Sequence, residues 1–476
     1  MNIFTRLTLF ALVSVLVFYT HSNVSADEDF VIDDDVLKRS ESLRQNALSS
    51  PLAYEIVESL TTEVGPRLAG SEAEQRARDW GLKLGNSLDF DAVRVEEFSM
   101  LYWDRGDLTI RLSEPFEQDL YGTALGGSGL AEKIDAPLVY FRNLAALEAA
   151  KEGSLTGKIA FIDGDFLVKS QTGAGYSAAN QKRRIGWQYA EQAGAEALVI
   201  RSVGSDSRRF PHTGMMSSKE GEWAKIPVIA VSNPDADHLR RLHNLDKTIS
   251  LQISSGAQWL GEVTSGNVIL DLIGREKPEE IVLIGGHLDS WDLGTGAVDD
   301  GAGVAITTAA ANLIAQLPQR PRRTIRVVMF GAEEVGLLGA RAYAEKHADT
   351  LKQHVLATES DFGARSVWQF VSNVNPDANA AIDAISEVLA PLGIVRGGSD
   401  IAGGGPDIIP LVQQGVPTVR LNQNGSDYFD LHHTPDDTLD KIDPDELAQN
   451  VAAYAVMVYL AAELDVEFRP ESTPSE

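Results

Sequence analysis

The chain has 476 residues and is strongly acidic, with 69 Asp and Glu against 41 Lys and Arg and a net charge of −28. This charge argues against a nucleic-acid partner, because phosphate binding requires clustered Lys and Arg. The absence of Cys excludes disulfides, thiolate nucleophiles and Cys-ligated zinc, so a metal could bind only to His, Asp and Glu. A hydrophobic fraction of 43% is typical of a globular protein, and the length allows two or three domains.

Residues 1–26 have the pattern of a secretory signal peptide. An apolar run at residues 7–19 follows Arg6, and it is shorter than the roughly 17–25 residues of a membrane-spanning helix. Small residues at positions 24–26 then offer a cleavage site. We therefore expect cleavage near Ala26 and a secreted or periplasmic protein with no stable membrane anchor. An N-terminal anchor that is retained is the alternative.

The composition divides the remaining chain into four segments. Residues 27–106 are expected to form the first, mainly helical part of the main domain, with a helix that begins after Ser71 as its N-cap. Short strands and Gly/Asp-rich turns predict an inserted β-rich domain at residues 107–260, with one helix at 183–193. Residues 261–466 complete the main domain. Residues 467–476 are rich in Pro, Ser and Glu, which predicts a disordered tail.

Strands and helices alternate in the C-terminal half. Apolar runs of buried-strand length lie at residues 281–284, 324–330, 355–358 and 417–421. Helical stretches lie between and after them, at residues 301–317, 335–347, 379–389 and 443–464. This alternation predicts an α/β fold whose central sheet is mostly parallel and carries helices on both faces.

Acidic residues and histidines follow these apolar runs, where ligands of a parallel sheet usually bind. They are His287 and Asp289, Asp299 and Asp300, Glu333 and Glu334, Glu359 and Asp361, and His432, His433, Asp436 and Asp437. Crowded, buried carboxylates repel one another, and one or two divalent cations would neutralise them. Zinc accepts imidazole and carboxylate ligands, and a shared carboxylate can hold two ions roughly 3.5–4 Å apart that activate a water molecule.

Each of these groups also has a structural interpretation. His287 alone could be a hydrogen-bonded structural residue, Asp299-Asp300 a helix N-cap and Glu333-Glu334 a charge pair at a helix start. Their convergence at one edge of one sheet favours a metal site. Asp289, two residues after His287, is expected to fix the ring of that histidine.

Several motifs resemble the co-catalytic di-zinc aminopeptidase and glutamate carboxypeptidase family of metallopeptidases. They are GHLDS at 286–290, DDG at 299–301, EE at 333–334, ESD at 359–361 and HTPDDT at 433–438. Three further motifs are similar to the carboxypeptidase Q (plasma glutamate carboxypeptidase) subgroup: GPRLAGS at 65–71, WDRG at 103–106 and PHTG at 211–214. The inserted segment, with IPVIAV at 226–231, resembles a protease-associated domain.

The resemblance implies a role for each site residue. It assigns one Zn²⁺ to His287 and Asp361, a second Zn²⁺ to Glu334 and His433, and the bridging position to Asp299. Of the tandem histidines, His433 is chosen because it immediately precedes Thr434, as the ligand does in the family. Glu333 would be the general base. Asp289, from its position next to His287, is predicted as the second catalytic residue. The family also favours a cis peptide after the bridging Asp, here Asp299-Asp300.

The substrate-binding residues are less sharply indicated. Tyr428 could donate to the oxyanion or pack in a loop, and Asp407 could bind a substrate ammonium or lie solvated in its Gly-rich loop. His212, in the inserted segment, could help close the site or lie on the surface. Arg67 could bind a substrate carboxylate or hold a helix turn in place.

The expected function is that of an exported di-zinc metallo-exopeptidase. It would hydrolyse dipeptides or short peptides with free termini by means of a hydroxide held between the metals, and it could form a homodimer as its relatives do. One alternative is an aminopeptidase that acts on longer peptides. Two others are a non-catalytic, receptor-like binding protein on the same fold and a single-zinc acyltransferase such as a glutaminyl cyclase.

Overall fold

The computed structural model describes residues 30–469 except residues 165 and 400. The expected signal peptide therefore lies outside the described residues, as does most of the expected tail. The tail prediction was wrong for residues 467–469, because Phe468 is buried and its carbonyl accepts a hydrogen bond from Asn375 N at 2.8 Å. No helix in residues 30–469, apart from the two positions left out, has the length and apolar character to cross a membrane.

The larger part of the molecule is built on an eight-stranded sheet in the order β1-β10-β12-β11-β13-β16-β14-β15. Its strands are β1 (Ala92–Asp104), β10 (Gln258–Leu272), β11 (Lys277–His287), β12 (Arg323–Phe330), β13 (His354–Glu359), β14 (Val367–Asn373), β15 (Val395–Arg396) and β16 (Thr418–Gln423). The four strands at the centre, β12, β11, β13 and β16, pair in parallel. The α/β class and all four expected strands are thus confirmed, whereas β1, β10 and β14 add antiparallel pairs that were not expected.

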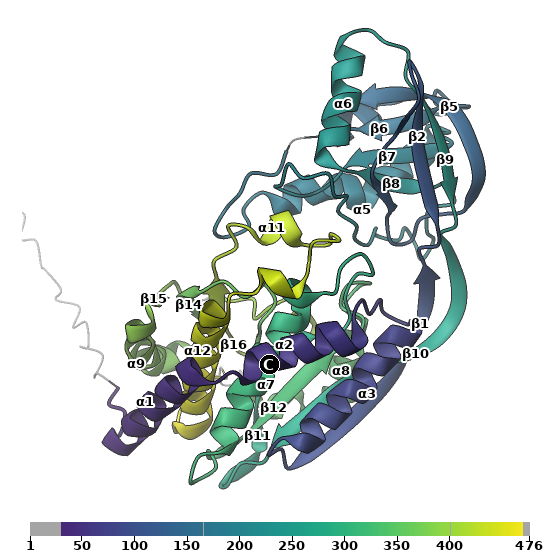
Figure 1. Cartoon of the computed structure of the whole chain (residues 1–476). Coiled ribbons are helices and arrows are strands. Elements are labelled where there is room, and N and C mark those ends of the chain that lie inside the picture. Colours follow the sequence, from purple (N-terminus) through teal and green to yellow (C-terminus); the bar gives the residue numbers. More distant parts are fainter. Residues whose placement is uncertain (1–29, 165, 400, 470–476) are drawn as a thin grey trace, which may run out of the picture.

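Helices cover both faces of this sheet, as predicted (Figure 1). They are α1 (Asp34–Ser49), α2 (Leu52–Ser59), α3 (Glu72–Ser87), α7 (Ala302–Ala315), α8 (Leu338–Lys346), α9 (Asn379–Leu389) and α12 (Pro444–Glu463). Along β11, Val282 and Ile284 belong to a core with α7 and α12, whereas Ile281 and Leu283 belong to a separate core with α8. This alternation follows from the two-residue period of a strand. The predicted N-cap is confirmed, since the Ser71 side chain accepts a hydrogen bond from Glu74 N.

Residues between β1 and β10 form a second eight-stranded sheet in the order β3-β2-β9-β5-β6-β7-β8-β4. Its strands are β2 (Leu108–Glu114), β3 (Gln118–Asp119), β4 (Gly122–Ala124), β5 (Ala131–Phe141), β6 (Ile159–Ile162), β7 (Ala197–Arg201), β8 (Val228–Val231) and β9 (Ser250–Ser255). The expectation of a single helix here was wrong: α4 (Leu144–Glu148) and α6 (Asn233–Asn244) accompany α5 (Tyr176–Gln192). Ser232 caps α6 and Pro234 lies in its first turn, and both residues are typical of the start of a helix.

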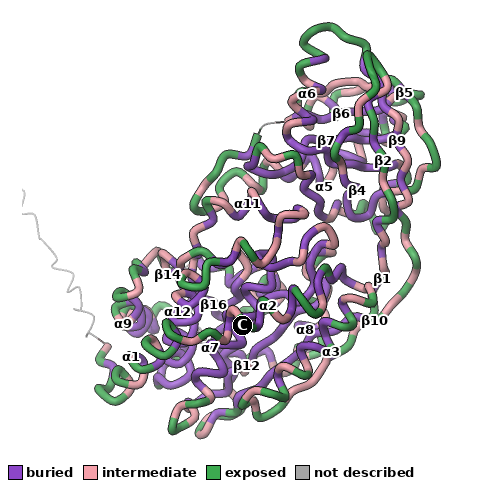
Figure 2. The backbone as a smooth tube through the Cα atoms, viewed as in Figure 1, coloured by how far each residue is buried: buried purple, intermediate pink, exposed green. Residues whose placement is uncertain are grey.

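Two long strands connect the parts. β1 and β10 pair from Ala92 with Asp271 to Asp104 with Gln258, and both run from one sheet toward the other (Figure 1). Loops of the second part also contact the loop that follows α11 (Tyr428–Leu431) in the first, through Thr213 N to His433 O at 3.0 Å. Buried backbone continues through this contact region (Figure 2). The second part therefore packs over the edge of the first sheet at which the predicted site lies.

Candidate metal centre

Two imidazoles and three carboxylates from five separate loops meet at the carboxyl ends of the parallel strands. Nε2 of His287 lies 3.0 Å from Oδ1 of Asp299 and 3.7 Å from Oδ1 of Asp361. Nε2 of His433 lies 2.9 Å from Oε2 of Glu334 and 3.4 Å from Oδ2 of Asp299. The two oxygens of Asp299 therefore face two different groups of side chains, His287 with Asp361 and His433 with Glu334.

Asp289 positions this centre through its main chain and its side chain separately. Nδ1 of His287 lies 2.9 Å from the main-chain oxygen of Asp289, which leaves Nε2 for Asp299. The carboxylate of Asp289 accepts hydrogen bonds from Glu333 N at 3.0 Å and from Glu334 N at 3.3 Å. The predicted contact with the His287 ring is thus made by the carbonyl, because the carboxylate is 3.8 Å away and is occupied by the loop after β12.

Two further carboxylates, which were not among the predicted site residues, hold the turn that carries Asp299. Asp300 accepts from His287 N and from Gly303 N, both at 3.0 Å, and the peptide bond between Asp299 and Asp300 is cis, as expected from the resemblance. Asp437 accepts from Val298 N at 2.6 Å and from Asp299 N at 3.2 Å. Nothing local to Asp437 identified this contact, because its partners are about 140 residues away in the sequence.

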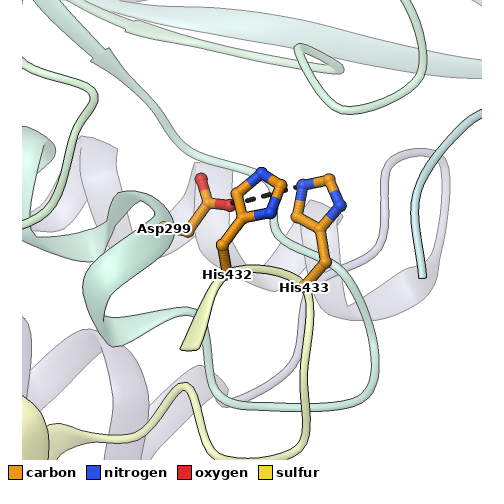
Figure 3. Close-up of side chains that lie close together, drawn as sticks. All are labelled: Asp299, His432 and His433. Carbon is orange, nitrogen blue, oxygen red and sulfur yellow. Dashed lines mark ion pairs between the residues drawn. The ribbon is translucent and has the colours of Figure 1, made fainter. Parts of the chain in front are cut away.

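The tandem histidines approach Asp299 together (Figure 3). Their rings stack with centroids 3.4 Å apart, and Nε2 of His432 lies 3.6 Å from Oδ2 of Asp299. His433 has a left-handed backbone, with φ at 63°, a conformation that L-residues adopt mainly where the surroundings impose it. It is His433 that contacts Glu334 in addition to Asp299. His432 lies within reach of the same carboxylate, although only His433 of the tandem pair was predicted as a ligand.

The centre is buried, and burial governs its protonation. Burial raises the pKa of Glu333 and that of Glu334 well above the usual range of a carboxyl. Burial alone would lower the pKa of His287, but its hydrogen bonds with Asp299 and Asp361 raise the pKa well above the ordinary value. Three buried carboxylate oxygens, Asp299 Oδ2, Glu334 Oε1 and Asp361 Oδ1, have no hydrogen-bond partner among the described residues.

Unpartnered, buried carboxylate oxygens beside imidazole nitrogens fit a divalent cation. Buried polar groups are nearly always hydrogen-bonded, and burying an unpaired carboxylate is costly. Imidazole nitrogen and carboxylate oxygen together are a donor set that zinc accepts. The residues present thus suit a metal, and two of the clusters, His287 with Asp299 and Asp361 and His432 with His433 and Asp299, share Asp299.

The centre lines a cleft of about 830 Å³ between the two parts of the molecule. Glu333 and Tyr428 lie in its wall with four residues of the centre, Asp299, Glu334, Asp361 and His433. Burial, followed by the nearby charges of Asp299 and Asp361, raises the pKa of Tyr428 well above its usual value, so its hydroxyl stays protonated and able to donate. Four arginines also line the cleft, and none of them has an ion-pair partner among the described residues: Arg183, Arg184, Arg341 and Arg420.

Two of the predicted substrate-binding residues do not reach this cleft. Asp407 is fully buried behind the wall, and its main-chain N–H donates to Glu359 Oε2 at 2.8 Å. Burial and the neighbouring Glu359 raise the pKa of Asp407 well above its usual value, so the interpretation as a solvated loop residue was wrong. His212 is also buried, with Nε2 2.5 Å from Asp206 Oδ2 and Nδ1 2.8 Å from His432 O. It therefore contacts the loop of the tandem histidines.

Arg67 holds loops in place, in agreement with the structural alternative. Its guanidinium donates to the carbonyl oxygens of Leu288, Thr295 and Gly296, at 2.6 Å for Thr295 and 2.9 Å for Gly296. The side chain is wholly buried and does not line the cleft. These carbonyls belong to the two loops that carry His287 and Asp299, so Arg67 fixes the position of one loop relative to the other.

The chain was compared with known proteins. The model of "Peptidase family M28" matches residues 267–458. Carboxypeptidase Q of Bos taurus is 32% identical over 440 residues, which cover 92% of this chain and 91% of that protein. The chain belongs to peptidase family M28. This M28 chain is therefore a metallopeptidase, and the resemblance seen in the sequence is confirmed.

Two further relatives agree with this assignment. The M28 chain is 48% identical to a peptidase M28 precursor from Shewanella amazonensis SB2B, whose crystal structure superposes with a TM-score of 0.89 and covers 92% of this chain and 99% of that one. Aminopeptidase YwaD of Bacillus subtilis is 26% identical over 89% of this chain and 87% of that protein. The M28 relatives thus include both a carboxypeptidase and an aminopeptidase by name.

Proposed function

We propose that the protein is an exported di-zinc exopeptidase that hydrolyses dipeptides or short peptides with free termini. The observation that carries the proposal is the position of Asp299, whose two carboxylate oxygens face His287 on one side and His433 on the other, at 3.0 and 3.4 Å. A carboxylate placed between two imidazoles suits a bridging ligand of two ions. Export is proposed from residues 1–26, with cleavage near Ala26.

The proposed ligand sets follow the two sides of Asp299. His287 and Asp361 would hold one zinc ion, and Glu334 and His433 the other. Bound there, zinc supplies a Lewis acid that polarises the substrate carbonyl and lowers the pKa of a water molecule. Asp289 contributes by fixing the main chain of Glu333 and Glu334, and Asp300 and Asp437 by fixing the turn of Asp299.

Glu333 is the proposed general base. It lies in the wall of the cleft next to the ligand Glu334, and burial raises its pKa, so its carboxylate accepts a proton readily. It would take a proton from the attacking water and deliver it to the nitrogen of the leaving amine. The Tyr428 hydroxyl, which stays protonated in the same wall, is placed to donate to the oxygen of the attacked carbonyl.

The four arginines of the cleft support a substrate with a free carboxylate. A guanidinium binds a carboxylate through two parallel hydrogen bonds, and these four are not engaged in ion pairs within the described residues. A peptide whose C-terminal carboxylate reaches them has to be short. We also propose that residues 107–260 form an inserted protease-associated domain, since they build a sheet of their own between β1 and β10. Helix α5 of this part supplies Arg183 and Arg184 to the cleft.

Glu333→Gln is the decisive variant. We expect it to keep its zinc and its melting temperature but to lose at least about 10²-fold in kcat, because general base catalysis contributes roughly 10²–10⁴-fold. Glu345→Gln, an exposed change on α8, is the matched control and should leave turnover unchanged. Zinc per chain is measured for both variants and for His287→Ala, which should bind less. Retained activity in Glu333→Gln contradicts the proposal.

A substrate panel separates the proposed function from its alternatives. Dipeptides should be cleaved faster than tetrapeptides, and N-acetylation or C-terminal amidation should slow cleavage. Preference for long peptides with a free amine and no need for a free carboxylate favours the aminopeptidase alternative. A binding protein would hydrolyse none of these peptides at any zinc load. Zinc near one per chain, with cyclisation of N-terminal glutamine, favours the acyltransferase alternative.

A further inference from the structure

An apolar pocket of about 380 Å³ lies where the two parts of the molecule join. Its walls include Trp103 and Met100 from β1, Trp259 from β10, and Met215 and Trp223 from the segment that precedes β8. β1 and β10 are the two long strands that run between the sheets (Figure 1). The volume lies in the range of small-molecule sites, which are mostly apolar and carry a few polar groups.

The pocket borders the cleft that holds the proposed metal centre. Four residues line both cavities: Met215, Trp223, Val335 and Leu338. Val335 directly follows Glu334, whose carboxylate contacts His433 at 2.9 Å. We infer from these shared residues that a peptide whose carbonyl lies at the metal centre has this pocket beside it.

The chemistry of the walls selects the occupant. The rings of Trp223 and Trp259 have centroids 5.1 Å apart, and the third indole of the pocket, Trp103, is buried. Indole faces favour aromatic and other large apolar partners. The carboxylate of Glu262, which accepts from Ser99 Oγ at the exposed rim, disfavours acidic side chains by like-charge repulsion.

We propose that this pocket binds a large apolar side chain, aromatic by preference, of the residue next to the cleaved peptide bond. The inference rests on the proposed peptidase function and adds the side-chain class that the substrate carries. The pocket is therefore a specificity site, separate from the metal ligands and from the arginines of the cleft.

The test compares kcat/KM for two dipeptide series, X-Ala and Ala-X, in which X is Ala, Leu, Phe, Trp or Glu. In one series the wild type should favour Phe or Trp over Ala by about 10- to 100-fold, as burial in an apolar pocket commonly gives, and Glu should be the poorest. Trp259→Ala should remove most of this preference and leave Ala-Ala hydrolysis unchanged. Trp368→Ala, a comparable loss of a half-buried indole on β14 outside both cavities, is the matched control.

Binding gives a readout that does not depend on turnover. In the Glu333→Gln background, Phe-Ala or Ala-Phe should bind at least tenfold more tightly than Ala-Ala by calorimetry, and Trp259→Ala should abolish the difference. Ser99→Phe, a substitution at an exposed rim position, should block large side chains and spare Ala-Ala. Hydrolysis of all peptides at similar rates with equal binding overturns this inference while the proposed function stands; no hydrolysis of any peptide overturns the proposed function instead.

A second copy of the chain is the other candidate occupant of the pocket, and it would give a different experimental result. If a second copy of the chain filled the pocket, Ser99→Phe would convert a dimer to a monomer in light scattering without altering the order of the dipeptides. That result overturns the specificity site.

Discussion

Replacing Asp289 with Asn removes one hydrogen-bond acceptor from a fully buried side chain and hardly changes its volume. In the structure the two oxygens accept from Glu333 N at 3.0 Å and from Glu334 N at 3.3 Å. The Asn side chain keeps one acceptor and turns an NH₂ toward the other N–H. The lost hydrogen bond to a charged group is worth about 1.5–3 kcal/mol, and the backbone N–H left without an acceptor costs about 1–3 kcal/mol more. The total loss is about 2.5–6 kcal/mol.

This loss divides between stability and catalysis, because the two N–H groups belong to the proposed base and a proposed ligand. If half of it arises from a displaced Glu333 in the transition state, kcat falls by about 10- to 100-fold. The assays are dipeptide kcat, zinc per chain and the free energy of unfolding in urea. Asp271→Asn is the control: Asp271 is buried on β10, is paired with Arg94 and Arg326, and does not line the cleft. It should lose stability with kcat unchanged.

The reasoning is refuted if Asp289→Asn keeps the wild-type kcat together with the wild-type stability. It is also refuted if Asp271→Asn lowers kcat as much, since the effect would then reflect general destabilisation.

Two further predictions concern residues outside the ligand set. Arg67→Met should lower the free energy of unfolding by about 3–5 kcal/mol, because three carbonyls, two of them in buried contacts, lose their donor. The KM of a dipeptide should stay constant at low temperature, whereas a raised KM with unchanged stability indicates a substrate contact instead. Burial alone would raise the pKa of Glu96, but hydrogen bonds with His347 and Arg94 lower this pKa from 4.5 to about 2. The stability that Glu96 adds is thus present above pH 4.5 and is lost toward pH 2. Glu96→Gln should melt lower than wild type at pH 7, with a difference that narrows below pH 4.5; a gap independent of pH excludes this origin.

The sequence was informative where a residue's environment depends on its near neighbours. Four apolar runs predicted the parallel strands, because a strand buried on both faces must be apolar throughout. The positions of His287, Glu334 and Asp361 just after such runs predicted that they meet, because parallel strands end at the same edge. The resemblance to the metallopeptidases came from the same short motifs.

The strands whose residues differ in burial were not predicted from the sequence. Along β1, exposed, half-buried and buried residues follow one another without regular alternation, because the strand begins in one sheet and ends at the other. Its partner β10 alternates between exposed and half-buried residues in its first half and is buried throughout its second. No window of sequence shows such a pattern as a strand, because the change of environment comes from the tertiary packing.

The sequence alone therefore determined the α/β class, the parallel centre of the sheet and a set of metal-type side chains at its edge, because these depend on local periodicity and on which residues follow a strand. The tertiary structure decided what holds that set in place and what lies beside it. Asp437 reaches Val298, Arg67 reaches Thr295 and His212 reaches His432 over 139, 228 and 220 residues of sequence. Contacts over such separations depend on how the two parts of the chain pack, and that packing leaves no local pattern in the sequence.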